Sequence, residues 1–482
     1  MNRDSSASAP LRLPGAEDTI AALATPAGRS AVAVLRLSGP AAHEVAARVL
    51  DPWQATPRRA YLSALYDPAT RALIDRPVVT VYAAPRSYTG EQLVELSVHG
   101  GYTVPALTLS ALLAAGAREA LPGEFTRRAV ANGKMDILQA EAVGDLIDAR
   151  SRAMHDVALA QLDGALSNRI AALRQAVIEL EALIAYDIDF PEEDEGPVPE
   201  TRVRNATAAL LRSLDALLAT ADTGEAVREG AVVVIAGAPN AGKSSLFNAL
   251  LGVSRAIVTD IPGTTRDALE AVLEIGRWPV RLVDTAGLRE TKETVERLGI
   301  EVSERYLARA DVVLACGDDA ESLSSAVARI HSLSAAPVIA VQTKCDLATP
   351  CATRTAEVPE APEAPEAREL SEVSGTAVVQ VSAATGEGLG DLAAVLGAVL
   401  DQAQGGREPD VPLLTRERHR RAVQLARDEV ALFDQARAAA ELPATIAAGH
   451  LRTAASALEE LIGTVDLDDV LDRVFSAFCV GK

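Results

Sequence analysis

The run Gly237-Ala-Pro-Asn-Ala-Gly-Lys-Ser244 fits the pattern G-x-x-x-x-G-K-[ST], whose residue types can hold phosphate. Its glycines let backbone N–H groups close around phosphate oxygens without a side-chain clash. Lys243 supplies positive charge for the outer phosphates, and the Ser244 hydroxyl is a ligand for Mg²⁺. An apolar run precedes the motif, and a helix is predicted over Ser245–Leu251 after it. The motif therefore predicts a nucleotide site, and taken alone its alternative is a chance glycine turn.

Four further segments occur in the order that a guanine nucleotide site requires. Asp284-Thr-Ala-Gly287 offers a metal-linked carboxylate and a glycine that can sense the γ-phosphate, and Gly263-Thr-Thr-Arg-Asp267 offers a threonine for the Mg²⁺ shell. Thr343-Lys-Cys-Asp346 follows an apolar run, and its carboxylate can pair with the N1–H and 2-amino groups of guanine. Ser382-Ala383 suits the loop behind the base. Five ordered elements in one segment predict GTP binding and hydrolysis.

The segments together define the predicted nucleotide contacts. These are Asn240, Ala241, Gly242, Lys243, Ser244, Ser245, Thr259, Asp260, Ile261, Pro262, Gly263, Thr264, Thr265, Asp284, Thr285, Ala286, Gly287, Thr343, Lys344, Asp346, Ser382 and Ala383. Leu288 stands where many GTPases have a glutamine that orients the attacking water. Hydrolysis must therefore use another polar group, together with positive charge near the transferring phosphate. On spacing alone, the nearby Glu296 and Arg266 are ordinary surface charges.

Length, composition and charge bound the class of protein. A chain of 482 residues with 49% apolar residues predicts several packed domains. No apolar run reaches the roughly 20 residues that span a bilayer, and the first residues lack a secretory signal, so we expect a cytoplasmic protein. The four cysteines show no C-x-x-C spacing, which argues against a zinc ribbon. A net charge of −21 means that any RNA partner needs a local basic patch or a basic helper subunit.

Changes in sequence pattern divide the chain into four segments. Strand-like runs at Ala31–Leu37, Val78–Tyr82 and Leu93–Val98 predict an α/β domain over residues 1–127. Apolar residues at helical spacing predict a helical domain in two parts, 128–229 and 401–482. Short β-branched runs between them predict a mixed, mainly parallel sheet over 230–400; they are Val232–Ala236, Val280–Val283, Val312–Ala315, Val338–Val341 and Val378–Val381. Residues 357–370, rich in Pro, Glu and Ala, are predicted to be a surface insertion, with a docking motif as the alternative.

Motifs outside the nucleotide segment carry a family resemblance. The chain resembles the tRNA-modifying GTPases called MnmE or TrmE at Asp18–Gly39, Tyr88–Gly101, Pro122–Phe125, Asn132–Ala142, Asp189–Asp194 and Phe478-Cys-Val-Gly-Lys482. The resemblance implies an N-terminal α/β folate-binding and dimerising domain, a discontinuous helical domain and an inserted P-loop GTPase domain. It also implies a heterotetramer with an MnmG-type FAD flavoprotein. The pair would add an aminomethyl or carboxymethylaminomethyl group at C5 of the wobble uridine of tRNA.

The resemblance further assigns cofactors and residue roles. The one-carbon unit would come from 5-formyl- or 5,10-methylene-tetrahydrofolate, bound by Arg36, Glu95, Lys134 and Lys482. Mg²⁺ would be held by Ser244 and Thr265, and K⁺ by Asn240, Thr259, Ile261 and Thr264, so that K⁺ replaces an arginine finger. Glu296 would position the attacking water through a bridging water. Cys479 is either a nucleophile toward uracil C6 or an apolar anchor of the C-terminal tail.

Thr343 departs from the asparagine usual in this guanine motif, which removes an amide that braces the base loop. We expect guanine selectivity to persist through Asp346. The alternative to the enzyme is a GTP-switched RNA-binding or ribosome-assembly factor. Such factors usually have a recognisable RNA domain or a second G domain, whereas this sequence has one P-loop and no basic KH-type segment.

Overall fold

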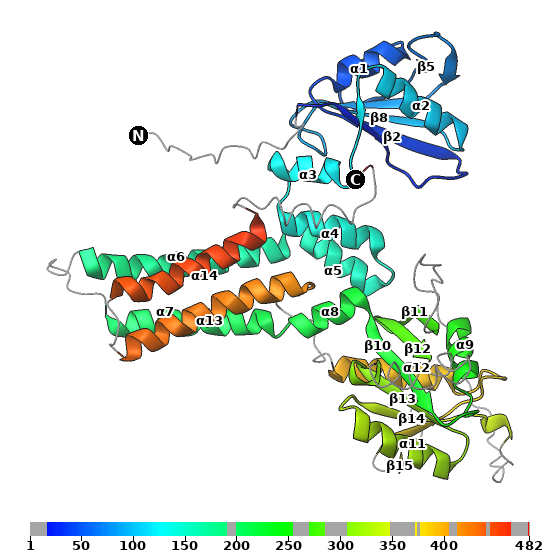
Figure 1. The fold of residues 1–482 in the computed structure, drawn as a ribbon, viewed down its shortest axis with the longest axis vertical. Coiled ribbons are helices and arrows are strands. Elements are labelled where there is room, and N and C mark those ends of the chain that lie inside the picture. Colours follow the sequence, from blue (N-terminus) through cyan, green and yellow to red (C-terminus); the bar gives the residue numbers. More distant parts are fainter. Residues whose placement is uncertain are drawn as a thin grey trace, which may run out of the picture. The chain divides into compact units, whose positions relative to one another are not determined.

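The computed structural model describes residues 17–189, 199–253, 269–284, 306–347, 372–373, 376–403, 412–439, 444–463 and 481 (Figure 1). The chain forms two compact units. The first contains residues 1–144, 161–178 and 452–482, and the second contains residues 145–160 and 179–451. Within the described residues, no helix is both long enough and apolar enough to cross a bilayer.

The first unit is built on a six-stranded sheet. Its order is β4 (Ala60–Leu62), β7 (Val78–Tyr82), β8 (Leu93–His99), β2 (Val32–Ser38), β1 (Ile20–Leu23) and β9 (Arg118–Glu119), antiparallel except for the last pair. A smaller sheet contains β3 (Leu50–Asp51), β5 (Ala64–Tyr66) and β6 (Leu73–Asp75). Helices α1 (Ala42–Val49) and α2 (Thr103–Ala114) share a hydrophobic core with the six-stranded sheet.

The alternation of residues along these strands decides which side chains remain available. Ala33, Leu35 and Leu37 are buried toward the helices, because successive strand residues point to opposite faces. Arg36 is therefore on the other face, where β2 and β8 pair it directly with Glu95. The polar face of the sheet can thus carry chemistry while the apolar face forms the core.

A further group of helices comes before and after the nucleotide-binding region in the sequence. They are α3 (Glu124–Ala131), α4 (Ile137–Asp148), α5 (Arg152–Leu162), α6 (Ala165–Asp189), α7 (Glu200–Leu218), α8 (Ala221–Glu229), α13 (Glu417–Ala439) and α14 (Ala444–Ile462). The predicted apolar stripes are buried, as Leu214 in α7 and Phe433 in α13 illustrate. Within the second unit α7 lies along α13 (Figure 1), and Arg427 forms an ion pair with Asp215 at 3.0 Å. Segments separated by the whole nucleotide region therefore pack together.

The second unit contains a seven-stranded sheet. Its order is β11 (Leu269–Ile275), β12 (Trp278–Asp284), β10 (Ala231–Gly237), β13 (Val312–Gly317), β14 (Val338–Gln342), β16 (Thr376–Gln380) and β15 (Glu372–Val373). The five inner strands are parallel and both edge strands are antiparallel, which confirms the mixed, mainly parallel sheet. The edge strands had no individual prediction.

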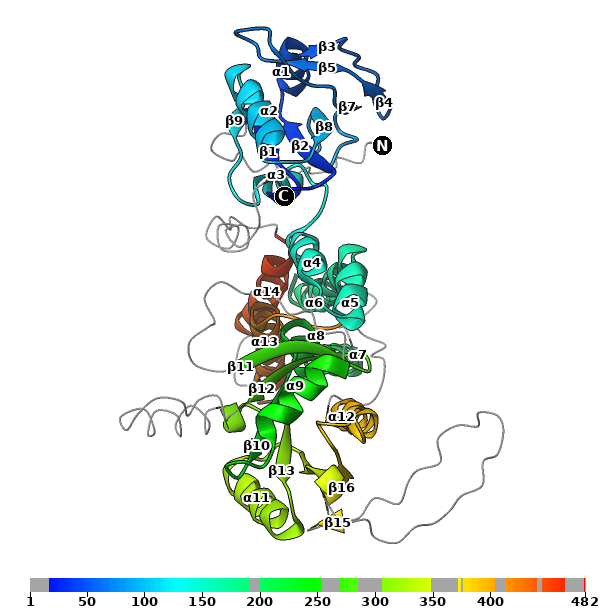
Figure 2. The ribbon, with the colours of Figure 1, turned by 90° about the vertical axis from the view of Figure 1, so that its right-hand side faces the viewer.

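Both faces of this sheet are covered by helices. The helices α9 (Lys243–Val253) and α12 (Leu389–Ala403) share one core cluster with the sheet, and α11 (Ala320–Leu333) shares the other (Figure 2). Val233 and Ile235 belong to the first cluster, and Val234 belongs to the second. Because both faces are buried, the parallel strands are continuous apolar runs in the sequence.

Candidate functional site

The phosphate-binding motif joins β10 to α9 through a loop with unusual backbone angles. Gly237 has φ +154°, and a Cβ there would lie 2.2 Å from the carbonyl oxygen of Cys316 on β13. Gly242 has φ +77°, and Asn240 also has a positive φ of 62°. A left-handed backbone at Gly242 and a close strand approach at Gly237 require glycine. Both glycines are therefore required by the geometry of the loop, and their role in phosphate binding stays a prediction.

Lys243 and Ser244 lie at the start of α9, at the end of the loop. Lys243 is 7% exposed, and its ammonium donates to the carbonyl oxygens of Gly237 at 3.1 Å and Ala238 at 2.7 Å. The Ser244 hydroxyl donates to Asp284 Oδ2 at 2.7 Å. Asp284 is buried at the end of β12 and pairs in register with Ile235 of β10. The structure thus brings a hydroxyl and a carboxylate, both suited to Mg²⁺, to one end of the sheet.

The base-recognition residues follow β14 and β16. Asp346 lies in a short 3₁₀ turn, and its carboxylate accepts a hydrogen bond from Ser382 Oγ at 2.7 Å. Lys344 has φ +57°, and its ammonium lies 3.0 Å from Asp318 Oδ2. The backbone N–H of Cys345 donates to Val381 at 3.3 Å, so the two loops are held together. The structure places these segments side by side, although 36 residues separate Asp346 from Ser382.

Thr343 contacts the phosphate loop itself. Its buried hydroxyl lies 2.9 Å from the Ala241 carbonyl oxygen and 3.3 Å from that of Gly317. A hydroxyl has one proton, so it donates to one of these oxygens at a time or shares the proton between them. Sequence reasoning missed this contact, because it identified only the amide that threonine lacks. The shorter side chain still connects the base loop to the phosphate loop.

The remaining nucleotide-site predictions lie outside the described residues. They are Thr259, Asp260, Ile261, Pro262, Gly263, Thr264, Thr265, Thr285, Ala286, Gly287 and Glu296, and in the C-terminal motif Cys479 and Lys482. Ser245 is the third residue of α9, and Ala383 directly follows Ser382. Roles for all of these positions stay predictions.

A second cluster of predicted residues lies on the polar face of the first unit's sheet. Arg36 forms an ion pair with Glu95 at 2.9 Å, and its guanidinium lies 5.1 Å from the centre of the Tyr88 ring. The Tyr82 hydroxyl donates to Glu95 Oε2 at 3.3 Å, and burial together with that carboxylate raises the pKa of Tyr82. Arg36 also donates to the carbonyl oxygen of Gly481 at 3.4 Å. The described part of the C-terminal motif therefore contacts this cluster.

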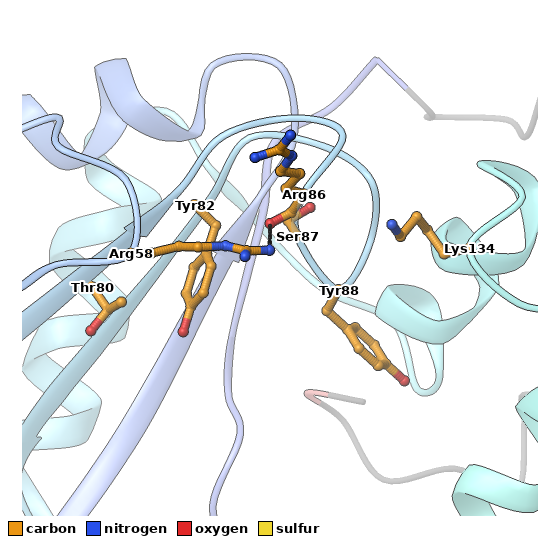
Figure 3. A pocket seen from close by; sticks show the side chains of 7 residues that line it. All are labelled: Arg58, Thr80, Tyr82, Arg86, Ser87, Tyr88 and Lys134. Carbon is orange, nitrogen blue, oxygen red and sulfur yellow. Dashed lines mark hydrogen bonds between the residues drawn. The ribbon is translucent and has the colours of Figure 1, made fainter. Parts of the chain in front are cut away.

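A pocket of about 520 Å³ opens beside this cluster (Figure 3). Its lining residues are Arg58, Thr80, Tyr82, Arg86, Ser87, Tyr88 and Lys134. Lys134 donates to the Pro85 carbonyl oxygen at 3.1 Å, which places this predicted folate residue at the pocket and not in the Arg36–Glu95 pair. The volume falls in the range of small-molecule sites. Sequence reasoning missed Arg58 and Arg86, since a lone arginine in a loop gives no signal.

A network of buried ion pairs connects α3 to the sheet of the first unit. Arg128 is 2% exposed and donates to Glu124 at 2.9 Å and to Glu91 at 3.2 Å. Glu91 also accepts from the Ser38 hydroxyl at 2.8 Å. Arg118 adds a second contact to Glu124 at 2.6 Å. Because each buried charge has an opposite partner, the network fixes α3 against the sheet without an uncompensated ion.

The second unit defines the chain as a P-loop GTPase. Its phosphate loop lies between a central parallel strand and α9, a carboxylate ends the adjacent strand, and the T-K-C-D segment follows β14. Comparison with known families makes this assignment specific. Residues 137–479 match the MnmE helical domain, and residues 19–134 match the GTP-binding protein TrmE N-terminus. The chain belongs to the MnmE family.

Curated relatives match over nearly the full length of the chain. The tRNA modification GTPase MnmE of Aquifex aeolicus (strain VF5) is 39% identical over 467 residues, covering 96% of this chain and 100% of the relative. The protein of the same name from Methylobacterium radiotolerans is 42% identical over 477 residues, covering 96% and 99%. The G domain of the T. maritima FeoB iron transporter is 25% identical over 36% of this chain and 98% of its own, with a TM-score of 0.24. That score is too low to carry a structural conclusion.

Proposed function

We propose that this GTPase acts in the modification of the wobble uridine of tRNA, together with an MnmG-type FAD flavoprotein. The carrying observation is the family match across both the TrmE N-terminal region and the helical region, because these regions distinguish the family from other GTPases. The names of the relatives describe tRNA modification GTPases. The product would be a carboxymethylaminomethyl or aminomethyl group at C5. FAD would belong to the partner, and the two proteins would form a heterotetramer.

Mg²⁺ fits the nucleotide site of the second unit. The Ser244 hydroxyl and the Asp284 carboxylate lie 2.7 Å apart at the phosphate end of the sheet, and both are hard oxygen ligands. Thr265 would complete the protein ligands of the ion. Bound there, Mg²⁺ would offset charge on the β- and γ-phosphates. Lys243 would bind the same phosphates after exchanging its two loop carbonyls for phosphate oxygens.

K⁺ is proposed as the second cation. Asn240 belongs to the phosphate loop, where its φ is 62°, and it would supply one ligand to the ion. Thr259, Ile261 and Thr264 would supply the other ligands. The ion would contribute positive charge in a site where Leu288 replaces the usual glutamine. Glu296 would orient the attacking water through a second water.

The polar face of the first unit is proposed to bind a tetrahydrofolate. Arg36 and Glu95 present donors and acceptors side by side at 2.9 Å, which suits the hydrogen-bonding edge of a pterin ring. Tyr88 and Tyr82 offer aromatic surface beside them. Arg36 contacts Gly481, and Cys479 and Lys482 lie within two positions of Gly481 in the sequence. The one-carbon unit would be delivered there, with Cys479 either attacking uracil C6 or anchoring the tail.

We also propose the domain limits 1–127, 128–229, 230–400 and 401–482. The packing of α7 along α13 supports a helical domain that the G domain interrupts. The first of these domains is proposed to mediate homodimerisation, and the protein is proposed to work in the cytoplasm.

Two experiments test the proposal. GTP turnover of the purified protein should be faster in KCl than in NaCl at equal ionic strength, whereas equal rates would remove K⁺ from the mechanism.

Mass spectrometry of tRNA nucleosides from a deletion strain should show loss of the modified wobble uridine. A Lys243→Ala copy should fail to restore it, because the variant loses nucleotide binding. A Cys479→Ser copy separates the two roles of the thiol: normal GTPase activity without modified uridine supports the nucleophile.

A further inference from the structure

Three cationic side chains surround the pocket of the first unit. Arg58, Arg86 and Lys134 line it, and none of the described residues in its lining is an aspartate or a glutamate. Figure 3 shows Arg58 and Lys134 directed toward the middle of the pocket from opposite sides. We propose that this pocket binds the glutamate tail of the folate, and that Arg58 and Arg86 make the protein prefer folates with several glutamates. The inference rests on the proposed folate function.

Two tyrosines connect the pocket to the proposed pterin site. Tyr82 lines the pocket and donates to Glu95, while Tyr88 lines the pocket and lies under the Arg36 guanidinium. The Arg36–Glu95 pair and the three cations therefore flank the same two rings. The groups of a folate come in the matching order, since a benzoyl ring joins its pterin to a chain of carboxylates. The aromatic rings would contact that middle ring.

The backbone holds Arg58 in place for this role. Its φ of 59° is left-handed, which is uncommon for a residue with a side chain, and its N–H donates to the Val81 carbonyl oxygen at 2.7 Å. One guanidinium nitrogen donates to the Arg86 carbonyl oxygen at 3.3 Å. A guanidinium carries five N–H donors in a planar fork, so this contact leaves several of them to bind a carboxylate. The arrangement ties Arg58 to the loop that carries Arg86.

The chemistry favours a small anion over an RNA backbone. The pocket is concave, holds about 520 Å³ and has two phenol rings in its wall, as small-molecule sites do. The chain as a whole has a net charge of −21, which opposes long-range attraction of a polyanion. A folate tail needs only a local group of cations, because each added glutamate brings one carboxylate.

The test measures binding of 5-formyl-tetrahydrofolate with one or three glutamates to the full-length protein by calorimetry. The triglutamate should bind about tenfold more tightly than the monoglutamate, which corresponds to one additional charge-assisted hydrogen-bonded contact. Arg58→Gln and Arg86→Gln should each reduce this ratio toward one and change the monoglutamate affinity little. Arg59→Gln is the matched control, because Arg59 is the exposed neighbour of Arg58 and does not line the pocket.

The outcomes separate this inference from the proposed function. If the monoglutamate does not bind, the folate proposal itself fails. If both forms bind equally, or if Arg59→Gln lowers the ratio as much as Arg58→Gln does, the tail-binding role is overturned while folate binding stands. The Arg58→Gln and Arg86→Gln variants could instead keep the wild-type ratio of triglutamate to monoglutamate affinity and bind tRNA more weakly. That result would assign the cations to RNA binding and would also overturn the inference.

Discussion

At the scale of single residues, Thr343 shows how a departure from a motif can keep its physical role. Asparagine would offer an amide at this position, whereas the threonine hydroxyl reaches the carbonyl oxygens of Ala241 and Gly317. The side chain is 4% exposed, so water cannot replace these contacts without rearrangement. The base loop is therefore tied to the phosphate loop by one buried hydroxyl.

Replacing Thr343 by valine should weaken GTP binding. Valine keeps the shape of threonine but removes the hydroxyl donor of the Ala241 carbonyl oxygen, whereas the Gly317 carbonyl oxygen keeps the backbone N–H of residue 343. Leaving a buried acceptor unsatisfied costs about 1–3 kcal/mol and lowers affinity by about tenfold. Titration of a fluorescent guanine nucleotide measures the effect. Thr343→Ser restores the hydroxyl and should bind close to the wild type. Equal affinities for the valine variant and the wild type would contradict the bracing role.

At the scale of secondary structure, the helices derive their stability from buried stripes. Phe433 of α13 is fully buried, while its neighbour Leu432 is 44% exposed. Adjacent residues on one helix therefore have very different surroundings, since a step of one residue turns the side chain by about 100°. Packing of α7 along α13 depends on the buried face.

The Phe433→Ala variant should lose about 3–5 kcal/mol of unfolding free energy, because it removes a large buried side chain and leaves a cavity. Leu432→Ala is the matched control and should change stability by less than about 1 kcal/mol, because Leu432 is 44% exposed and lies off the buried face of the helix. Urea denaturation followed by circular dichroism measures both. Similar losses in the two variants would show that the stripe does not support the helix pair.

The contact of α3 with the first sheet should depend on pH through Glu124. Burial raises the pKa of this carboxyl, but hydrogen bonds from Arg118, the Leu121 N–H and Arg128 outweigh burial and leave its pKa below the ordinary 4.5. A carboxyl with a lowered folded-state pKa stabilises the fold above its ordinary pKa. That stability is lost as pH falls through the folded value.

The Glu124→Gln variant should therefore be less stable than the wild type at pH 7, and the difference should shrink as the pH falls below 4.5. Unfolding free energies from denaturant titrations between neutral and acidic pH measure this trend. Glu119→Gln is a suitable control, since Glu119 is an exposed neighbour of the network. A difference that grows on acidification would contradict the sign of the shift.

At the scale of the whole molecule, the two candidate sites belong to different compact units. The nucleotide loop lies in the second unit and the Arg36–Glu95 face lies in the first. The main sheet of each unit has its own hydrophobic core. A ligand bound in one unit should therefore stabilise mainly that unit. The nucleotide site and the proposed folate site therefore lie in separate units.

Hydrogen exchange should report this division. A saturating guanine nucleotide with Mg²⁺ should slow exchange in peptides from β10, α9 and β14, with up to about 2.7 kcal/mol of protection at a hundredfold excess over Kd. A folate should slow exchange in β2 and β8 instead. Mass spectrometry of the full chain with each ligand alone provides the comparison. Protection of β2 by the nucleotide equal to that of β10 would show that the sites are not independent.

The sequence by itself determined the parts of this protein that depend on local pattern. The phosphate motif, the parallel strands and the helical stripes were predictable, because glycine conformation, β-branched runs and helical spacing each act over a few residues. The edge strand β11 was missed although it carries a local pattern, in which the half-buried Glu274 stands between the buried Leu273 and Ile275. Its antiparallel pairing with β12 is a tertiary contact that this pattern does not specify.

Only the tertiary structure decided which distant side chains meet. Arg36 pairs with Glu95 across 59 residues, and Thr343 reaches Ala241 across 102. Strand register and loop geometry set these contacts, and the sequence spacing of the residues involved predicts neither. The pocket of Arg58, Arg86 and Lys134 has the same origin: each cation is an ordinary surface charge until the sheet brings the three loops together.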